Sequence, residues 1–122
     1  MVRQYKKEQQ FTLELQLGSA LPDTLVGTSG NDTQLAGAGD DTAYGSSGND
    51  FIRLDAGRDI ALGGLGNDTL YGGSAVIDNA DSGDLLYGDS GSDWLFGNGG
   101  NDVALGGDGT DTLYGGQGAD SL

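Results

Sequence analysis

The stretch that decides the fold is residues 63–71, Gly63-Gly64-Leu65-Gly66-Asn67-Asp68-Thr69-Leu70-Tyr71. Its Asp at the sixth position recurs along the chain with a spacing of nine residues, broken by one interval of sixteen. The series is Asp32, Asp41, Asp50, Asp59 and Asp68, followed by Asp84, Asp93, Asp102, Asp111 and Asp120. A short fixed period means that one small unit is repeated and stacked, so the sequence predicts a solenoid rather than a globule with a unique core.

The repeat divides residues 27–122 into ten units. They are the nonapeptides 27–35, 36–44, 45–53, 54–62 and 63–71, a sixteen-residue unit 72–87, the nonapeptides 88–96, 97–105 and 106–114, and a shorter last unit 115–122. Positions one to five are rich in Gly, position six is Asp, and positions seven to nine are mostly apolar or Thr. The last three positions favour a short strand, whose middle residue faces opposite to its two neighbours.

Two units, eighteen residues, would return the chain to its start one strand spacing higher, so alternate units should stack. One predicted inner column is Gln34, Ile52, Leu70, Leu95 and Leu113, and the other is Ala43, Ala61, Leu86, Ala104 and Leu122. Large side chains in one column mostly face small ones in the other, as a thin core requires. We therefore expect an all-β solenoid of about five coils.

The charge of the chain is concentrated in the repeat. Only three of the nineteen acidic residues precede residue 25. The sixteen others are Asp, and the only basic residues after position 25 are Arg53 and Arg58, so the repeat region accounts for the net charge of −14. Self-repulsion of this size should keep the chain expanded unless the charge is neutralised. Nucleic acids and anionic membranes are poor partners for such a field.

Several classes of chemistry are excluded by composition. The chain has no Cys and no His, which rules out disulfides, thiolate chemistry and His-ligated zinc or iron. Residues 1–10 are too polar for a signal peptide, and no apolar run reaches the length of a membrane span. Paired carboxylates such as Asp40 and Asp41 imitate a glycosidase site, but an Asp in every turn is better explained by a metal ion. We expect no enzymatic activity.

The repeated Asp sits in a Gly-rich turn, and this combination indicates calcium. Calcium takes several oxygen ligands, including carboxylates and backbone carbonyls. Gly permits positive φ and close backbone approach, so carbonyls of such a turn can converge on one ion.

The units resemble the G-G-x-G-x-D-x-U-x repeat of the RTX family, the haemolysin-type calcium-binding repeat. Residues 63–71 match at every fixed position, as do residues 106–114, GGDGTDTLY, and the resemblance covers residues 27–122. It implies a right-handed parallel β-roll that holds calcium between the turns of neighbouring coils. It also implies secretion by a type I exporter and folding on contact with extracellular calcium.

Carried over to this chain, the resemblance implies two ladders of calcium ligands. One ladder is Asp32, Asp50, Asp68, Asp93 and Asp111, and the other is Asp41, Asp59, Asp84, Asp102 and Asp120. The backbone of the turn glycines would add ligands at Gly30, Gly48, Gly64, Gly66, Gly107 and Gly109. If each adjacent pair in a ladder flanks one ion, four and four pairs give up to eight calcium ions.

Three turns depart from the repeat. Leu54 and Asp55 replace the Gly pair of the fourth unit, where Arg58 would compete with a cation. The sixteen-residue unit has Ser82 where position four should be Gly. Thr28 replaces Gly in the first turn, which indicates an incomplete site.

Outside the repeat region, 25–122, residues 1–24 form a flanking segment in which residues 11–17 alternate like a strand. This strand either caps the first coil or pairs with another chain. The inserted residues near 74–82 predict a loop, either a tolerated bulge or a recognition loop. The outward positions seven and nine are unusually apolar, so these faces and the open C-terminal end are candidates for a protein partner or self-association.

The sequence thus predicts a calcium-binding structural module of a secreted or cell-surface protein. Two alternatives stay open at this point. One is an adhesin-like or ice-binding surface, and the other is a docking or oligomerisation module of a larger exported hydrolase or toxin.

Overall fold

The computed structural model describes residues 14–73 and 82–122, and within these ranges every regular element is a strand. The strands are β1 (Glu14–Leu17), β2 (Thr24–Val26), β3 (Asp32–Leu35), β4 (Thr42–Ser47), β5 (Phe51–Arg53), β6 (Ile60–Leu65), β7 (Thr69–Tyr71), β8 (Leu85–Ser90), β9 (Trp94–Gly99), β10 (Val103–Asp108) and β11 (Thr112–Gln117). No helix that could cross a membrane is found among these residues. The predicted loop near 74–82 lies almost entirely outside the described residues.

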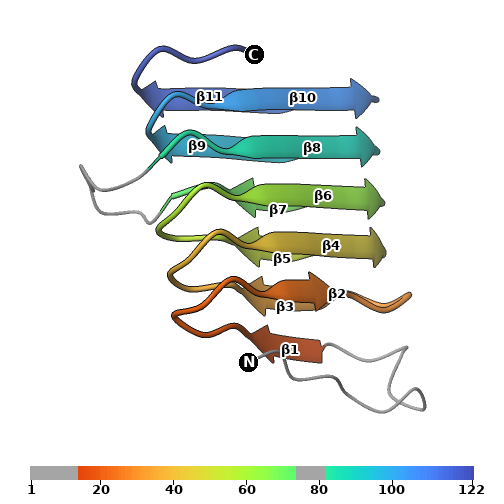
Figure 1. Ribbon diagram of the computed structural model, residues 1–122. Helices are drawn as coiled ribbons and strands as arrows, with labels where there is room; N and C mark the ends of the chain where they lie inside the picture. Colours follow the sequence, from red (N-terminus) through yellow and green to blue (C-terminus); the bar gives the residue numbers. More distant parts are fainter. Residues whose placement is uncertain (1–13, 74–81) are drawn as a thin grey trace.

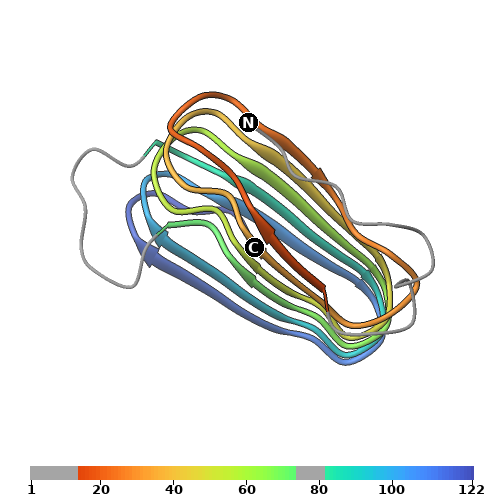
Figure 2. The ribbon, with the colours of Figure 1, turned by 90° about the horizontal axis from the view of Figure 1, so that it is seen from below.

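The strands form two parallel sheets that the chain visits in turn (Figure 1). The odd-numbered strands make a six-stranded sheet in the order β1-β3-β5-β7-β9-β11, and the even-numbered ones a five-stranded sheet in the order β10-β8-β6-β4-β2. Seen along the stack, each coil is a flattened loop with a strand on each long side and a turn at each end (Figure 2). The nine-residue period predicts such a solenoid, and the resemblance to the RTX repeat implies its parallel β-roll form.

The register confirms eighteen residues per coil. Gln34 pairs with Ile52, and Ala43 with Ala61, each eighteen residues apart. Where the sixteen-residue unit intervenes, Leu70 pairs with Leu95 instead. The insertion is therefore accommodated without a shift of the strand register. A slip of one residue would have turned the inward side chains to the outer face.

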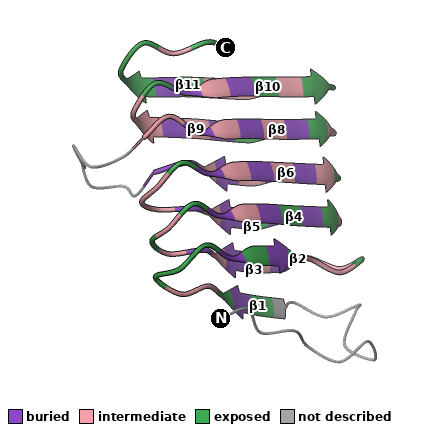
Figure 3. Cartoon of the chain, viewed as in Figure 1, coloured by how far each residue is buried: buried purple, intermediate pink, exposed green. Residues whose placement is uncertain are grey.

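The core is the narrow space between the two sheets, and the predicted middle residues fill it (Figure 3). Those of β4 to β10 are buried, namely Ala43, Ile52, Ala61, Leu70, Leu86, Leu95 and Ala104. Leu113 is only partly buried, and Leu122, which we expected to face inward, is 63% exposed because no described strand packs over the last rung. Two residues at position one, Ala36 and Leu54, also join the core, although the sequence analysis placed position one in the turn.

The first coil begins before the first unit recognised in the sequence. Glu14–Leu17 forms β1, which pairs with β3 and so lies at the end of the six-stranded sheet. Residues 11–13 of the predicted strand lie outside the described residues. Leu25 of β2 is fully buried and pairs with Ala43.

Hydrogen bonds between side chains take the place of apolar packing in this first coil. Gln34 donates from Nε2 to Gln16 Oε1 at 2.8 Å and to the Tyr44 carbonyl at 3.0 Å. Gln16 in turn donates to the Val26 carbonyl at 2.6 Å. These bonds tie the two sheets together through buried amide N–H groups, whereas Gln34 Oε1 is buried without a partner among the described residues.

Candidate metal centre

The turns at both ends of the roll carry the repeated Gly and Asp residues, and their backbone explains the need for Gly. In the turn that leads to Asp68, position two (Gly64) has φ 102° and position four (Gly66) has φ 121°. Side chains are disfavoured in this left-handed region, and position four is Gly in every described turn where its φ is positive. At position two the region is also occupied by Ser46, Asp55, Asp89 and Asn98.

Stacking imposes a second requirement on the same glycines. A Cβ on Gly66 would lie closer than 3.0 Å to the Gly48 carbonyl oxygen of the turn below, and one on Gly109 would meet the Gly91 carbonyl in the same way. A Cβ on Gly48, Gly64 or Gly107 would likewise lie closer than 3.0 Å to a carbonyl oxygen of the preceding coil. The carbonyl oxygens of positions two and four therefore line the space between successive turns.

We expect Gly66→Ala to destabilise the folded roll by about 3 kcal/mol or more, since the new Cβ both clashes with a backbone oxygen and sits at unfavourable φ. Thermal unfolding in saturating calcium measures the loss. Ser46→Ala is the matched control, because position 46 already carries a Cβ at φ 83°. An equal loss of stability in both variants would show that close stacking at position four is unimportant.

The repeated Asp residues stack in two ladders, with the partners predicted from the eighteen-residue coil. In each step the backbone N–H of one Asp donates to Oδ1 of the Asp one coil further along the chain. The first ladder joins Asp32, Asp50, Asp68, Asp93 and Asp111 at 2.7–3.0 Å. The second joins Asp41, Asp59, Asp84, Asp102 and Asp120 at 2.7–2.9 Å.

The sequence analysis missed one member of the second ladder. The N–H of Asp23 donates to Asp41 Oδ1 at 2.8 Å, and Asp23 is itself buried. Asp23 lies nine residues before Asp32, so the nine-residue spacing of Asp extends one unit towards the N-terminus. The signal is weak in the sequence, because residues 18–22 lack the Gly pattern and contain the only Pro.

Most of these carboxylates are shielded from solvent. The eight predicted ladder residues from Asp32 to Asp102 are at most 3% exposed, whereas Asp111 and Asp120 in the last coil are partly buried. The second oxygen, Oδ2, is buried without a hydrogen-bond donor among the described residues at Asp41, Asp50, Asp68, Asp93 and Asp102. In four of these five it lies where a Cβ on the position-one Gly of the same turn would be, so only Gly leaves it room.

Burial also makes these groups hard to ionise without a counter-charge. It raises the pKa of Asp50 to about 7, with the neighbouring ladder carboxylates of Asp68 and Asp32 adding to the shift. Burial likewise raises the pKa of Asp41 and of Asp68 to about 6. The pKa values of Asp93 and Asp102 are raised for the same reason. A buried carboxylate with one oxygen that lacks a donor is costly when charged, so a bound cation would stabilise the charged form at each of these sites.

The donor set fits a hard cation. Within the described ranges no three acidic side chains gather to form a metal site by themselves. Each turn contributes one ladder carboxylate, so an ion bound there would take further ligands from backbone carbonyls such as those of positions two and four. Carboxylate and carbonyl oxygens in a flexible turn are what calcium prefers, whereas zinc and copper favour the nitrogen and sulfur ligands that this chain lacks.

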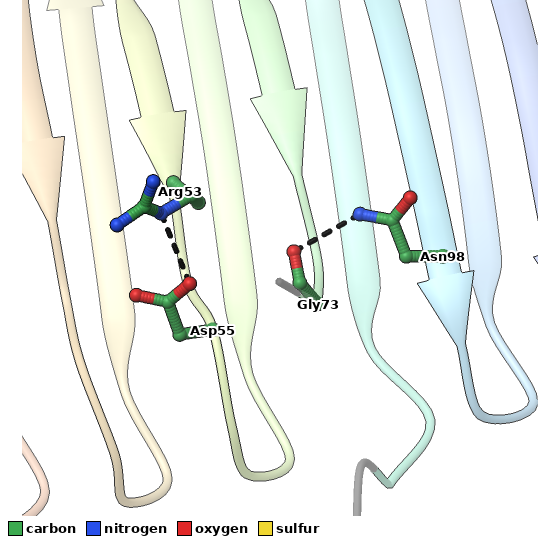
Figure 4. A network of polar contacts seen from close by, with 4 residues as sticks. All are labelled: Arg53, Asp55, Gly73 and Asn98. Atoms are coloured by element: carbon green, nitrogen blue, oxygen red, sulfur yellow. Dashed lines mark hydrogen bonds and ion pairs between the residues drawn. The ribbon is translucent and has the colours of Figure 1, made fainter. Parts of the chain in front are cut away.

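Polar side chains contact two of the units that depart from the repeat (Figure 4). The Asp55 carboxylate forms an ion pair with Arg53 at 3.0 Å. Arg58 is exposed, and its backbone N–H donates to Asp40 Oδ1 at 3.0 Å. Beside the insertion, Asn98 donates from Nδ2 to the Gly73 carbonyl at 3.0 Å, so a side chain engages this position-two oxygen.

Comparisons with known proteins agree with this geometry. The sequence matches the family described as RTX calcium-binding nonapeptide repeat (4 copies) over residues 17–52, 26–61, 54–75 and 82–122. No curated protein matches the chain significantly. The fold is similar to the solution structure of the AlgE6R3 subunit of the Azotobacter vinelandii mannuronan C5-epimerase, with a TM-score of 0.51 and 33% identity. That match covers 65% of this chain and 46% of the solved chain, so the present chain spans about half the length of that relative.

Proposed function

The chain belongs to the RTX calcium-binding nonapeptide repeat family, and from this premise we propose that it is a structural module that folds when its turns bind several calcium ions. The observation that carries the proposal is the series of buried Oδ2 atoms without a donor in the turns of both ladders. The ladder Asp residues would each supply a carboxylate, and the turn glycines would supply carbonyl oxygens. Calcium bound there neutralises the repeated negative charge, and binding free energy becomes folding free energy.

We place this folding outside the cell. Extracellular calcium modules bind at about 10⁻⁴–10⁻³ M, so they stay empty at the low calcium level of the cytosol and fill after export. RTX repeats occur in secreted proteins, and a chain without Cys is suited to such a route, with type I export as the proposed pathway. The module itself is proposed to have no catalytic activity, because its repeated, buried carboxylates are committed to the ladders.

A second candidate is a docking module of a larger exported enzyme or toxin. One observation favours it: an aromatic column runs along the outer face of the six-stranded sheet. Tyr71 stacks on Phe96 with ring centroids 4.7 Å apart, and Phe96 stacks on Tyr114 at 5.1 Å. Beside them Trp94 is 50% exposed. The solved relative is a subunit of an epimerase, so a β-roll that accompanies an enzyme has a precedent.

An ice-binding surface has less support. Such a surface needs a row of side chains whose polar groups face the solvent. The oxygens of Asn31 and Asn49 instead accept the backbone N–H of the next coil, at 2.7 and 2.9 Å. Their hydrogen-bonding capacity is thus spent partly within the roll.

The proposal is tested by calorimetric titration of calcium into the metal-free chain and into two Asp→Asn variants. Asp68→Asn removes a buried ladder charge, and we expect it to lose at least one ion and to raise the calcium midpoint roughly tenfold, the equivalent of about 1.4 kcal/mol. Asp108→Asn is the matched control, since Asp108 is exposed and lies outside both ladders. A wild-type chain that takes up no calcium, or two variants with the same defect, would refute the proposal.

A further inference from the structure

Two turns at the N-terminal end of the roll differ from the turns of Asp41 and Asp50, because donors within the turn reach Oδ2 of their Asp. The backbone N–H of Thr28 donates to Asp32 Oδ2 at 2.7 Å. The Thr28 hydroxyl lies 3.1 Å from Oδ1 and 3.2 Å from Oδ2 of the same carboxylate. In the preceding turn along the chain, both the backbone N–H and the hydroxyl of Ser19 donate to Asp23 Oδ2, the hydroxyl at 3.0 Å.

The two closures have the same construction. In each, the hydroxyl of the position-two residue also accepts the backbone N–H two residues further on, from Gly30 to Thr28 and from Leu21 to Ser19, both at 3.1 Å. This is the local pattern by which Ser and Thr stabilise turns. The carboxylate, the hydroxyl and the two backbone groups thus form a closed hydrogen-bonded ring without an ion.

The backbone of position two differs between these two turns and most of the later ones. Neither Ser19 nor Thr28 has positive φ, whereas the residue at position two does in eight later turns. Those residues are Gly37, Ser46, Asp55, Gly64, Asp89, Asn98, Gly107 and Gly116. The N–H groups of Thr28 and Ser19 therefore point to the Asp of the same turn and donate to its Oδ2. At Asp41 and Asp50 the equivalent Oδ2 has no donor among the described residues.

We propose that the turns of Asp23 and Asp32 are metal-free closures, in which hydroxyl and N–H donors replace the cation, so that the calcium ladders begin at Asp41 and Asp50. This inference rests on the proposed calcium function and adds which turns take part. It removes the pair Asp32–Asp50 from the predicted sites. The first ladder keeps three adjacent pairs from Asp50 onwards, and the second keeps four from Asp41 onwards. The expected number of calcium ions is therefore at most about seven.

The closures also give the roll an N-terminal foundation that needs no metal. They lie in the same coils as the hydrogen-bonded pair Gln16 and Gln34, where amides replace apolar contacts. Polar bonds within the protein thus hold this end, while the later coils depend on the charge balance of their turns.

The test compares Asp32→Asn with Asp50→Asn in the full chain, by counting bound calcium in equilibrium dialysis and measuring the calcium midpoint of folding. An Asn oxygen can still accept the Thr28 N–H, so Asp32→Asn should keep the wild-type count and a midpoint within about twofold. Asp50→Asn should lose at least one ion. Thr28→Gly opens the first turn and should add one ion, whereas Thr28→Ser should not.

The outcomes separate this inference from the proposed function. If the wild type binds calcium and Asp32→Asn loses as many ions as Asp50→Asn, the closure is overturned and the calcium function stands. If the wild type binds no calcium, the proposed function fails and the closure inference fails with it. Should Thr28→Gly not fold, the pair of Asn variants still decides, because each retains the size and shape of the native side chain.

Discussion

In excess chelator at neutral pH, the chain is expected to lose its β-sheet signal and to regain it cooperatively when calcium is restored. Sixteen Asp residues face two Arg residues in the repeat, and the ladders place buried carboxylates one strand spacing apart. The core offers little compensation, because the inner column of the five-stranded sheet contains three Ala residues, Ala43, Ala61 and Ala104. Without a cation the folded state must hold charges that the expanded chain keeps in water.

The expected size of the effect follows from linkage. At a calcium concentration ten times the dissociation constant, each filled site adds about 1.4 kcal/mol to stability, so seven sites add on the order of 10 kcal/mol. This is comparable to the whole stability of an ordinary domain, about 5–15 kcal/mol. Removal of calcium should therefore unfold the roll rather than loosen it.

Far-UV circular dichroism and Trp94 fluorescence measure the transition. Trp94 is half exposed and its ring lies 6.1 Å from that of Phe96 on the same face of β9, so its emission should shift when the sheet forms. Magnesium is the control, because it demands stricter octahedral geometry and gives up its water reluctantly. A roll that stays folded in chelator would mean that packing alone suffices and that the ladders serve another purpose.

The sequence was sufficient to predict the coil, the register and the ladders, because all three follow from one period. An Asp every nine residues and two units per coil determine that Asp50 stacks between Asp32 and Asp68. The same period places Ile52 and Leu70 in the core. A periodic signal of this kind is insensitive to a single irregular unit, which explains why the insertion did not disturb the prediction.

The start of the roll was harder to recognise, for a physical reason. We looked for Gly in the turns, but a rung of the ladder requires only a backbone N–H, a carboxylate and an inward side chain. Asp23, Leu25 and Gln16 satisfy that requirement without the Gly pattern. The position-one residue Leu54 was likewise assigned to a turn, although its side chain is fully buried.

The difference between closed and open turns was beyond the reach of the sequence. Ser19 and Ser46 both occupy position two, yet Ser46 adopts φ 83° while Ser19 closes on its own Asp. The same residue type thus gives either a donor to the carboxylate or a left-handed turn that leaves the carboxylate open. The residue type at position two alone therefore does not determine which turn forms.

Acid should substitute for calcium, and this is the second large effect that we expect. In chelator, lowering the pH from about 7 towards 4 should fold the chain, whereas most proteins lose stability over this range. The pKa of Asp50 is raised by burial to about 7, and those of Asp41 and Asp68 to about 6, from an ordinary value of 3.8. The folded state therefore binds more protons than the unfolded chain between pH 7 and pH 3.8.

The sign of the effect follows from that difference. When the folded state binds more protons, stability rises as pH falls, so the burial penalty is fully relieved only below 3.8 and returns as pH rises through the folded pKa values. Each pKa unit corresponds to about 1.4 kcal/mol, which makes the relief at three such carboxyls several kcal/mol or more. In saturating calcium the dependence should reverse, because protons then compete with the ion for the same oxygens.

Circular dichroism in chelator as a function of pH measures this directly, with light scattering recorded alongside because the chain approaches its isoelectric point near pH 4.1. Asp50→Asn provides the matched control. It removes the carboxyl with the highest of these pKa values, so its metal-free roll should fold at a higher pH and with a shallower dependence than the wild type. Asp108→Asn, on the exposed surface, should leave the midpoint near that of the wild type. A chain that remains unfolded at pH 4 would show that calcium does more than cancel the buried charge, since it would also be needed to draw the turn carbonyls together.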